Sequence, residues 1–417
     1  MPNQIQWINA LSTRASLEAA VAEIVESVGK SLSNTPDLGI LFISSAYTSE
    51  YPRLVPLLLE KLPLPVLIGC GGGGIIGVNA QNRVLEVENN PAISLSVAHL
   101  PDVEIHPFHI AGDSLPDLDS SPQSWAELIG VPPEKQPHFI LLSDTFSSKI
   151  NDLLEGLDFA YPGSVKVGGL ASSNSMATQS ALFYYSENNP GRYLYTEGTV
   201  GIALSGNIVV DTIVAQGCRP IGEPYTVNKG ERNVILELTD TDGTSRPPLE
   251  FLRDLIQSLS EEDRQLAQNS LFLGVVRDEF KLKLKPGDFL IRNLLGVDPR
   301  YGAIAIGDRV RPGQRIQFHL RDAQASALDL ETLLSLYQQE KSGAPPTVGA
   351  LMFSCLGRGE GLYGIPNFDS ELFWQYLDQM PLGGFFCNGE IGPVAGRTFL
   401  HGYTSVFGII RQPSAQS

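Results

Sequence analysis

The sequence lacks the features that mark disulfide-stabilised, zinc-binding and membrane-spanning proteins. Its 417 residues contain four cysteines, none of them in a CxxC pair: Cys70, Cys218, Cys355 and Cys387. So few cysteines predict neither a disulfide framework nor a zinc ribbon, and we expect reduced thiols. No apolar run of about 18 residues occurs, and the amino-terminal stretch has no basic region followed by an apolar one. We therefore predict a cytoplasmic protein without a membrane span or a signal peptide.

Basic residues are also scarce. The chain has 29 Lys and Arg against 46 Asp and Glu, which gives a formal net charge of -17. This charge repels phosphate backbones and anionic lipid surfaces, so we expect neither nucleic acid nor a membrane among the partners.

The common catalytic signatures GxxxxGK[ST], HExxH and GxSxG are absent. The segment "GEGLYG" (359–364) matches GxGxxG, but Pro366 stands where a dinucleotide-binding helix would have to begin. We interpret it as a lid over a pocket, with a structural loop as the alternative. The pair His106 and His109 is too isolated to predict a metal site. We predict no cofactor, no metal and no catalytic residue.

A unit of strand, polar turn, helix, strand and glycine loop occurs three times. The first strands are "GILFISS", "HFILLSD" and "GALMFSC", at 39–45, 138–144 and 349–355. Each precedes an amphipathic helical pattern and a proline, and the second strand then runs into glycines, in "VLIGCGGGGIIG", "VKVGGLASSN" and "GGFFCNGEIGP". From Ser44 to Cys70 and from Ser143 to Gly169 the separation is 26 residues in both cases.

These units predict an α/β fold with mixed sheets. Two parallel strands joined by a helix place both following loops at the carboxyl ends of the strands, where open α/β sheets bind ligands. Because the chain exceeds the usual size of one core, we expect two related modules. The expected parts are an amino-terminal strand and helix (1–37), a first module (38–222), a second module (223–411) and a disordered tail (412–417).

The strand ends and glycine loops supply the candidate ligand-binding residues. To act as a nucleophile, the Cys387 thiol would need a nearby imidazole or a helix N-terminus to lower its pKa, and His401 is the nearest histidine in sequence. The alternatives for Cys387 are a small buried hydrophobic residue and a pocket-lining one. We expect Gly389 to have a positive φ or to press against a ligand or another backbone segment. The candidate set is Ser44, Ser45, Cys70, Asp144, Gly169, Cys355, Arg358, Glu360, Cys387, Asn388, Gly389, Glu390 and His401.

Three long motifs resemble FIST domains, named after F-box and intracellular signal transduction proteins. They are "GFFCNGEIGPVAGRTFLHGYTS", "RNLLGVDPRYGAIAIGDRVRPGQRIQFHLRDA" and "KVGGLASS", at 384–405, 292–323 and 166–173. The resemblance implies FIST N-like and FIST C-like modules in a sensor that binds a small ligand, with amino acids as candidates, and a signalling protein as a further partner.

A zwitterionic ligand suggests a clamp in which Arg358 grips the carboxylate and Glu390 takes the ammonium. The competing expectation is that Arg358 and Glu390 pair with each other or with solvent. Two other functions remain open: a cysteine-dependent enzyme using Cys387 or Cys355, and a protein–protein adaptor as in F-box FIST proteins.

Overall fold

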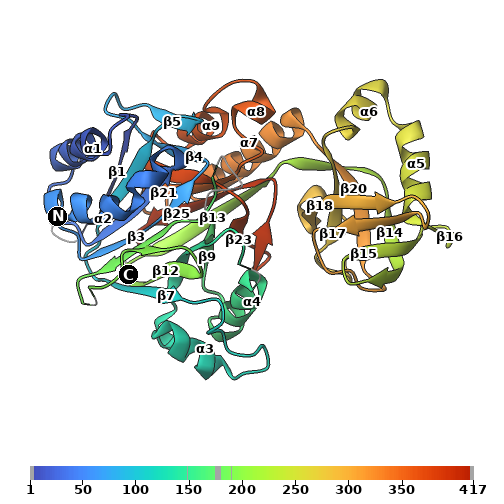
Figure 1. The fold of residues 1–417 in the computed structure, drawn as a ribbon, viewed down its shortest axis with the longest axis horizontal. Helices are drawn as coiled ribbons and strands as arrows, with labels where there is room; N and C mark the ends of the chain where they lie inside the picture. The colour runs from blue at the N-terminus through green and yellow to red at the C-terminus, as the bar shows by residue number, and fades with distance from the viewer. Residues whose placement is uncertain (1–3, 148, 174–179, 189, 414–417) are drawn as a thin grey trace. The chain divides into compact units, whose positions relative to one another are not determined.

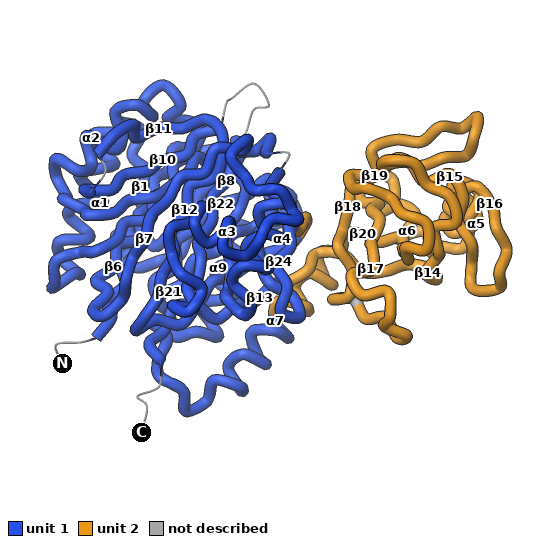
Figure 2. The backbone as a smooth tube through the Cα atoms, turned by 90° about the horizontal axis from the view of Figure 1, so that it is seen from below, with its two compact units in different colours: residues 1–214, 331–400, 404–417 blue, residues 215–330, 401–403 orange. Residues whose placement is uncertain are grey.

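A computed structural model describes residues 4–147, 149–173, 180–188 and 190–413. Most of the tail predicted to be disordered, from residue 414 on, lies outside the described residues. The chain forms two compact units (Figure 2). The first contains residues 1–214, 331–400 and 404–417, and the second contains residues 215–330 and 401–403.

The three predicted units are confirmed as three β-α-β repeats. In each repeat the two strands are parallel neighbours, with Leu41 opposite Gly69, Leu141 opposite Gly168, and Met352 opposite Gly384. Each glycine loop therefore begins at the carboxyl end of a strand beside the one that carries the polar turn. The elements are β2 (Leu38–Ser44), α2 (Tyr51–Lys61) and β3 (Val66–Gly72); β8 (His138–Ser143), α4 (Ile150–Ala160) and β9 (Lys166–Leu170); β21 (Thr347–Cys355), α9 (Phe368–Tyr376) and β22 (Leu382–Cys387).

Each repeat builds one six-stranded mixed sheet, which confirms the predicted fold class. The strand orders are β1-β6-β2-β3-β10-β11, β24-β23-β9-β8-β12-β7 and β13-β25-β21-β22-β4-β5. The additional strands are β1 (Gln6–Ser12), β4 (Gly74–Val78), β5 (Val84–Glu88), β6 (Ile93–His99), β7 (Val103–Ile110), β10 (Leu182–Ser186), β11 (Leu194–Tyr195), β12 (Thr199–Gly206), β13 (Val209–Gln216), β23 (Glu390–Val394), β24 (Arg397–His401) and β25 (Thr404–Arg411).

The repeats exchange strands in a cycle. After its glycine loop, the first repeat sends β4 to pair with β22 of the third. The second repeat sends β10 to β3 of the first, and the third sends β23 to β9 of the second. The third repeat, assigned by sequence to the second module, therefore folds in one unit with the first two. The predicted modules 38–222 and 223–411 thus differ from the compact units.

The first unit has its helices outside and an apolar core between its three sheets (Figure 1). Helices α1 (Leu17–Ser31) and α2 cover the first sheet, and α3 (Pro122–Ile129) and α4 cover the second. In the core, Phe42 of the first repeat stacks on Phe385 of the third, with ring centroids 5.0 Å apart. The amino-terminal strand and helix, which we predicted to pack on the first module, are β1 and α1. Strand β1 pairs with β6 in the first sheet, and α1 packs on the same sheet.

Hydrogen bonds join the glycine loops where the repeats meet. The Gly73 N–H donates to Ser172 Oγ at 2.8 Å, and Ser172 Oγ donates to the Phe386 carbonyl. The Asn388 N–H donates to the Leu170 carbonyl at 3.1 Å. These hydrogen bonds join residues of all three repeats. The polar backbone groups that form them are therefore already paired within the protein and are not available to a ligand.

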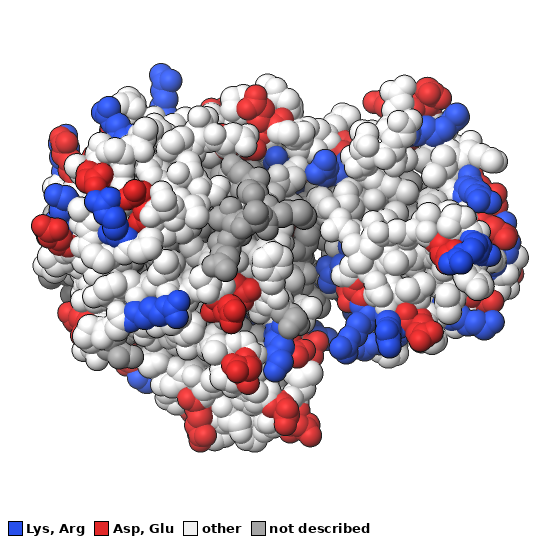
Figure 3. Space-filling model, viewed as in Figure 1, with Lys and Arg blue, Asp and Glu red and all other residues white. Residues whose placement is uncertain are grey.

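The second unit is an antiparallel sheet with its own core. The strand order is β14-β20-β17-β18-β19-β15-β16, and Phe251 and Leu255 of α5 pack on this sheet. On the face drawn in Figure 3, acidic and basic side chains are interspersed within this unit. The elements are β14 (Cys218–Glu231), β15 (Val234–Thr239), β16 (Ser245–Arg246), α5 (Pro248–Ser258), α6 (Glu261–Ala267), β17 (Leu271–Val276), β18 (Phe289–Asp298), β19 (Ala303–Ile306) and β20 (Arg315–Arg321). Helix α7 (Ala323–Glu340) begins in the second unit and ends in the first, and α8 (Glu360–Tyr363) belongs to the first unit.

Candidate functional site

The structure does not bring the predicted ligand-binding residues together in one cavity. Ser44 is buried and its Oγ accepts the Ala92 N–H at 3.1 Å, whereas Ser45 is partly exposed in the turn that follows β2. The side chain of Asn388 is exposed. His401 is buried and belongs to the second compact unit. The remaining candidates are the buried thiols with Gly169, the partly exposed Cys355, the internally paired Arg358, the loop residues Gly389 and Glu390, and two residues that border separate cavities, Asp144 and Glu360.

The thiols of Cys70 and Cys387 are wholly buried. Burial raises the pKa of both thiols well above the usual value, so each stays protonated at neutral pH. A Cβ added to Gly169 would lie 2.4 Å from Cys387 Sγ, so Gly169 provides the space that this thiol fills. Cys355 is partly exposed, and its Sγ accepts the Gly357 N–H at 3.4 Å.

Arg358 forms an internal ion pair that the sequence did not predict. Its Nε and Nη2 lie 2.6 Å and 2.9 Å from the two carboxylate oxygens of Asp369, and both residues are at most 1% exposed. Nη2 also contacts the Tyr363 hydroxyl at 2.5 Å, and this hydroxyl donates to Asp369. The fork that we expected to grip a ligand carboxylate is therefore occupied by Asp369. Because Asp369 is eleven residues further on, in α9, neither loop motif pointed to it.

Glu390 is buried, so its carboxyl group is not exposed to receive the ammonium of a ligand as we expected. Its Oε2 accepts hydrogen bonds from the Thr404 N–H at 3.1 Å and from the Thr404 hydroxyl at 2.8 Å, while Oε1 has no partner within the described part of the chain. Burial raises the pKa of this carboxyl to about 8, against the lowering effects of Thr404 and Arg358. At neutral pH the neutral acid is therefore the favoured form in the folded protein.

Replacing Glu390 with Gln is expected to flatten the pH dependence of stability. The carboxyl has a pKa of about 8 in the folded state and about 4.3 when unfolded. Between these values the folded state binds the extra proton, so stability falls as pH rises, by at most about 1.4 kcal/mol per unit. Urea unfolding at pH 5.5, 6.5 and 7.5 should show Glu390→Gln gaining stability relative to the parent as pH rises. Parallel pH profiles would show that Glu390 is already ionised in the folded protein.

The prediction of a positive φ at Gly389 is wrong. Gly389 is not among the described glycines with positive φ, and a Cβ placed there would first meet side-chain carbons of Leu400 and Leu170, at 3.0 Å and 3.2 Å. Glycine at this position leaves room for two leucines rather than providing a left-handed turn. Its carbonyl accepts the Leu170 N–H at 2.8 Å, so the other half of the expectation, contact with another backbone segment, describes this position better.

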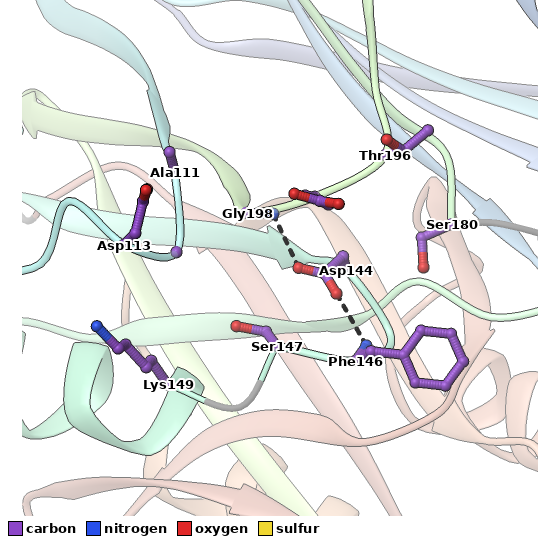
Figure 4. A pocket seen from close by; sticks show the side chains of 11 residues that line it. Ala111, Asp113, Asp144, Phe146, Ser147, Lys149, Ser180, Thr196 and Gly198 are labelled. Atoms are coloured by element: carbon purple, nitrogen blue, oxygen red, sulfur yellow. Dashed lines mark hydrogen bonds between the residues drawn. The ribbon is translucent and has the colours of Figure 1, made fainter.

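Asp144 borders a cavity of about 710 Å³. Its Oδ1 accepts the Phe146 N–H and its Oδ2 accepts the Gly198 N–H, both at 2.8 Å (Figure 4). The carboxylate thereby ties the turn after β8 to the start of β12. Further lining residues come from the loops after β7, before α4, before β10 and before β12: Ala111, Gly112, Asp113, Ser147, Lys149, Ser180, Thr196 and Glu197.

This cavity carries exposed charges of both signs: Lys149 is basic, and Asp113 and Glu197 are acidic. Lys149 is also the N-cap residue of α4, whose amino terminus receives no side-chain cap. Cavities of roughly 300–1,000 Å³ suit small molecules. Sequence reasoning selected Asp144 because it follows the end of a strand. It missed Asp113 and Glu197 because they come from loops distant in the chain, and it missed Lys149 because that residue lies beyond the polar turn, at the start of α4.

The geometry defines an α/β protein with a polar cavity at the carboxyl edge of one sheet. Among the described residues, none of the helices is both long and apolar enough to cross a membrane. Residues 37–241 match the FIST N domain and residues 248–393 match the FIST C domain. The chain therefore belongs to the FIST family, whose modules serve in general as sensors in signal transduction.

Relatives span almost the whole chain. An uncharacterized protein of Mycobacterium tuberculosis is 36% identical over 95% of this chain and 97% of its own length. Another uncharacterized protein, from Mycobacterium bovis, is 32% identical over 95% of this chain and 96% of its own length. An F-box/LRR-repeat protein of Arabidopsis thaliana is 28% identical over 46% of this chain and 38% of its own length. The cyanuric acid hydrolase of A. caulinodans covers 98% of this chain and 100% of its own, at a TM-score of 0.32 and 8% identity, a likeness too weak to inform fold or function.

Proposed function

We propose that this protein is a cytoplasmic sensory module that binds a small zwitterion of the amino acid class in the cavity beside Asp144. The observation that carries the proposal is the presence of both charge signs around a cavity of ligand size, at the carboxyl edge of a sheet. The cytoplasmic assignment is supported by the four cysteines, none of which forms a disulfide in the described part of the chain.

Each end of a zwitterion has a complementary group. Lys149 attracts a carboxylate, and the uncapped N–H groups of the first turn of α4 add a favourable dipole at the same place. Asp113 and Glu197 attract the ammonium. Asp144 has a different role, because both of its oxygens already accept backbone N–H groups; it holds the loops that carry the other residues.

Thermal unfolding against a panel of the common amino acids tests this proposal. A ligand present at a hundred times its dissociation constant should stabilise the protein by about 2.7 kcal/mol. Lys149→Met should remove most of that stabilisation, because the variant loses the charge that faces the carboxylate and keeps a side chain of similar length. Asp113→Asn should also weaken binding, because the variant loses a negative charge that attracts the ammonium of the ligand.

The matched control is Lys61→Met, which removes an exposed lysine from the end of α2, on another sheet. It should leave the ligand-induced shift unchanged. The proposal fails if no amino acid raises the unfolding temperature, or if Lys149→Met responds to the ligand as Lys61→Met does.

We favour binding over catalysis because Cys387 is wholly buried and held as a neutral thiol, which disfavours its use as a nucleophile. A second candidate function is that of a protein–protein adaptor. It is favoured by large apolar side chains exposed on the second unit, including Phe280 at 94% and Leu282 at 95%, and by the F-box relative. Recovery of a stoichiometric protein partner with the full chain, lost in Phe280→Ser, would support the adaptor.

A further inference from the structure

A second cavity, of about 510 Å³, lies between β5 and the start of α8 and α9, away from the residues that line the Asp144 cavity. Three carboxylates border it, those of Glu86, Glu88 and Glu360. None of the three is paired with Lys, Arg or His in the described part of the chain, and the adjacent Arg358 is engaged with Asp369. This cavity, here called the acidic cavity, therefore has an excess of negative charge.

Glu86 is the residue that points most directly to a missing ligand. Its side chain is 6% exposed, and its Oε1 accepts the Ser370 N–H at 2.8 Å. Its Oε2 has no hydrogen-bond partner among the described residues, although Glu86 borders the cavity. An unpaired buried carboxylate oxygen costs about 1–3 kcal/mol or more, which a donor entering from the cavity would offset.

The neighbouring groups set the chemistry of that donor. Glu88 Oε1 accepts the Glu360 N–H at 2.9 Å, so its carboxylate is held beside α8. The acidic groups do not converge as metal ligands do, because among the described residues no three His, Cys, Asp or Glu side chains are grouped to hold an ion. Apolar atoms for a carbon chain come from Leu85, Val87 and Pro366, and further polar groups come from Asn89, Asn90 and Asn367.

We propose that the acidic cavity binds an aliphatic polyammonium ion, with its ammonium groups on Glu86, Glu88 and Glu360 and its methylene groups on the apolar lining. An ammonium donates three hydrogen bonds and carries the charge that the cavity lacks. This site is separate from the Asp144 cavity and does not depend on the function proposed for it. The segment predicted to be either a lid or a structural loop supplies α8, which forms one wall.

Proton release should accompany binding. Burial raises the pKa of Glu86 to about 8, and the groups that face it are Asp369 and Glu88, which add to this effect, and Tyr363. Beyond Asp369 lies Arg358, paired with it. A bound ammonium stabilises the ionised carboxylate, so the complex holds fewer protons than the free protein near pH 7. Affinity should therefore rise between pH 6 and pH 8.

Isothermal titration calorimetry of the full chain with spermidine and 1,4-diaminobutane tests the proposal. We expect saturable binding at one site. Because the buffer takes up the protons released on binding, the apparent heat should differ between buffers of different ionisation enthalpy at the same pH. Glu88→Gln should weaken spermidine binding at least tenfold. Glu86→Gln should do the same and also abolish the buffer dependence, and Glu88→Gln keeps the proposal testable if Glu86→Gln does not fold.

Two controls separate this site from other causes. Glu155→Gln removes one exposed negative charge from α4 and should leave the affinity unchanged, which excludes general attraction to an acidic protein. Lys149→Met alters the Asp144 cavity and should also leave spermidine binding unchanged. The proposal is overturned if neither polyamine binds, if Glu86→Gln and Glu88→Gln bind like the parent, or if CaCl2 displaces spermidine at equal concentration.

Discussion

Replacing Gly168 with Ala is expected to destabilise the first unit by about 4 kcal/mol or more, enough to leave little folded protein. Gly168 lies in β9 with a φ of +156°. A Cβ at this position would lie 1.8 Å from the carbonyl oxygen of Leu141, its partner on β8. Because the obstacle is the backbone of a neighbouring buried strand, it has no rotamer to change, and the two strands would have to separate.

The same contact recurs in the other repeats, so the result should recur as well. A Cβ on Gly69 would lie 2.2 Å from the Leu41 carbonyl oxygen, and one on Gly384 would lie 1.9 Å from that of Met352. Urea unfolding measures the loss for each variant. The matched control is Gly29→Ala, in an open position on α1, where alanine should be neutral or stabilise by up to about 1 kcal/mol. If Gly168→Ala unfolds with the same midpoint as Gly29→Ala, the close strand approach is not required.

Replacing Arg358 with Met is expected to cost about 3–5 kcal/mol, because it leaves the carboxylate of Asp369 buried without its counter-charge. Of the side-chain donors that the structure describes at Asp369, the Tyr363 hydroxyl alone would remain. Loss of the Arg358 charge also leaves Glu86 next to the Asp369 carboxylate without the arginine that compensates it. The loss is measured by urea unfolding, with the slope of the transition checked for a change in the surface exposed.

The double variant Arg358→Met, Asp369→Leu should recover much of the loss, because it removes both buried charges together. The control Arg53→Met removes an arginine whose two partners, Glu18 and Glu50, form exposed pairs, and it should change stability by less than about 1 kcal/mol. A loss as small for Arg358→Met as for Arg53→Met would mean that water reaches Asp369 and that the ion pair is not internal.

The sequence by itself determined the three β-α-β repeats and their parallel strands. Each strand is a short apolar run, each helix is amphipathic, and each helix is followed by a proline that stops it, so the information lies within about 30 residues of chain. The glycines within β3, β9 and β22 were also visible in the sequence, and their role in the close approach of neighbouring strands follows from the pairing. The FIST motifs added the family.

Only the tertiary structure decided which polar residues meet. The exchange of β4, β10 and β23 among the repeats depends on pairing between distant segments, and this exchange, rather than the order of modules in the sequence, places the third repeat in the first unit. The partner of Arg358 could not be read from its own loop, because Asp369 lies in a separate helix. Burial likewise changed the chemistry of Cys387 and Glu390: the same groups would be a reactive thiol and a carboxylate in water, but desolvation keeps both protonated inside this fold.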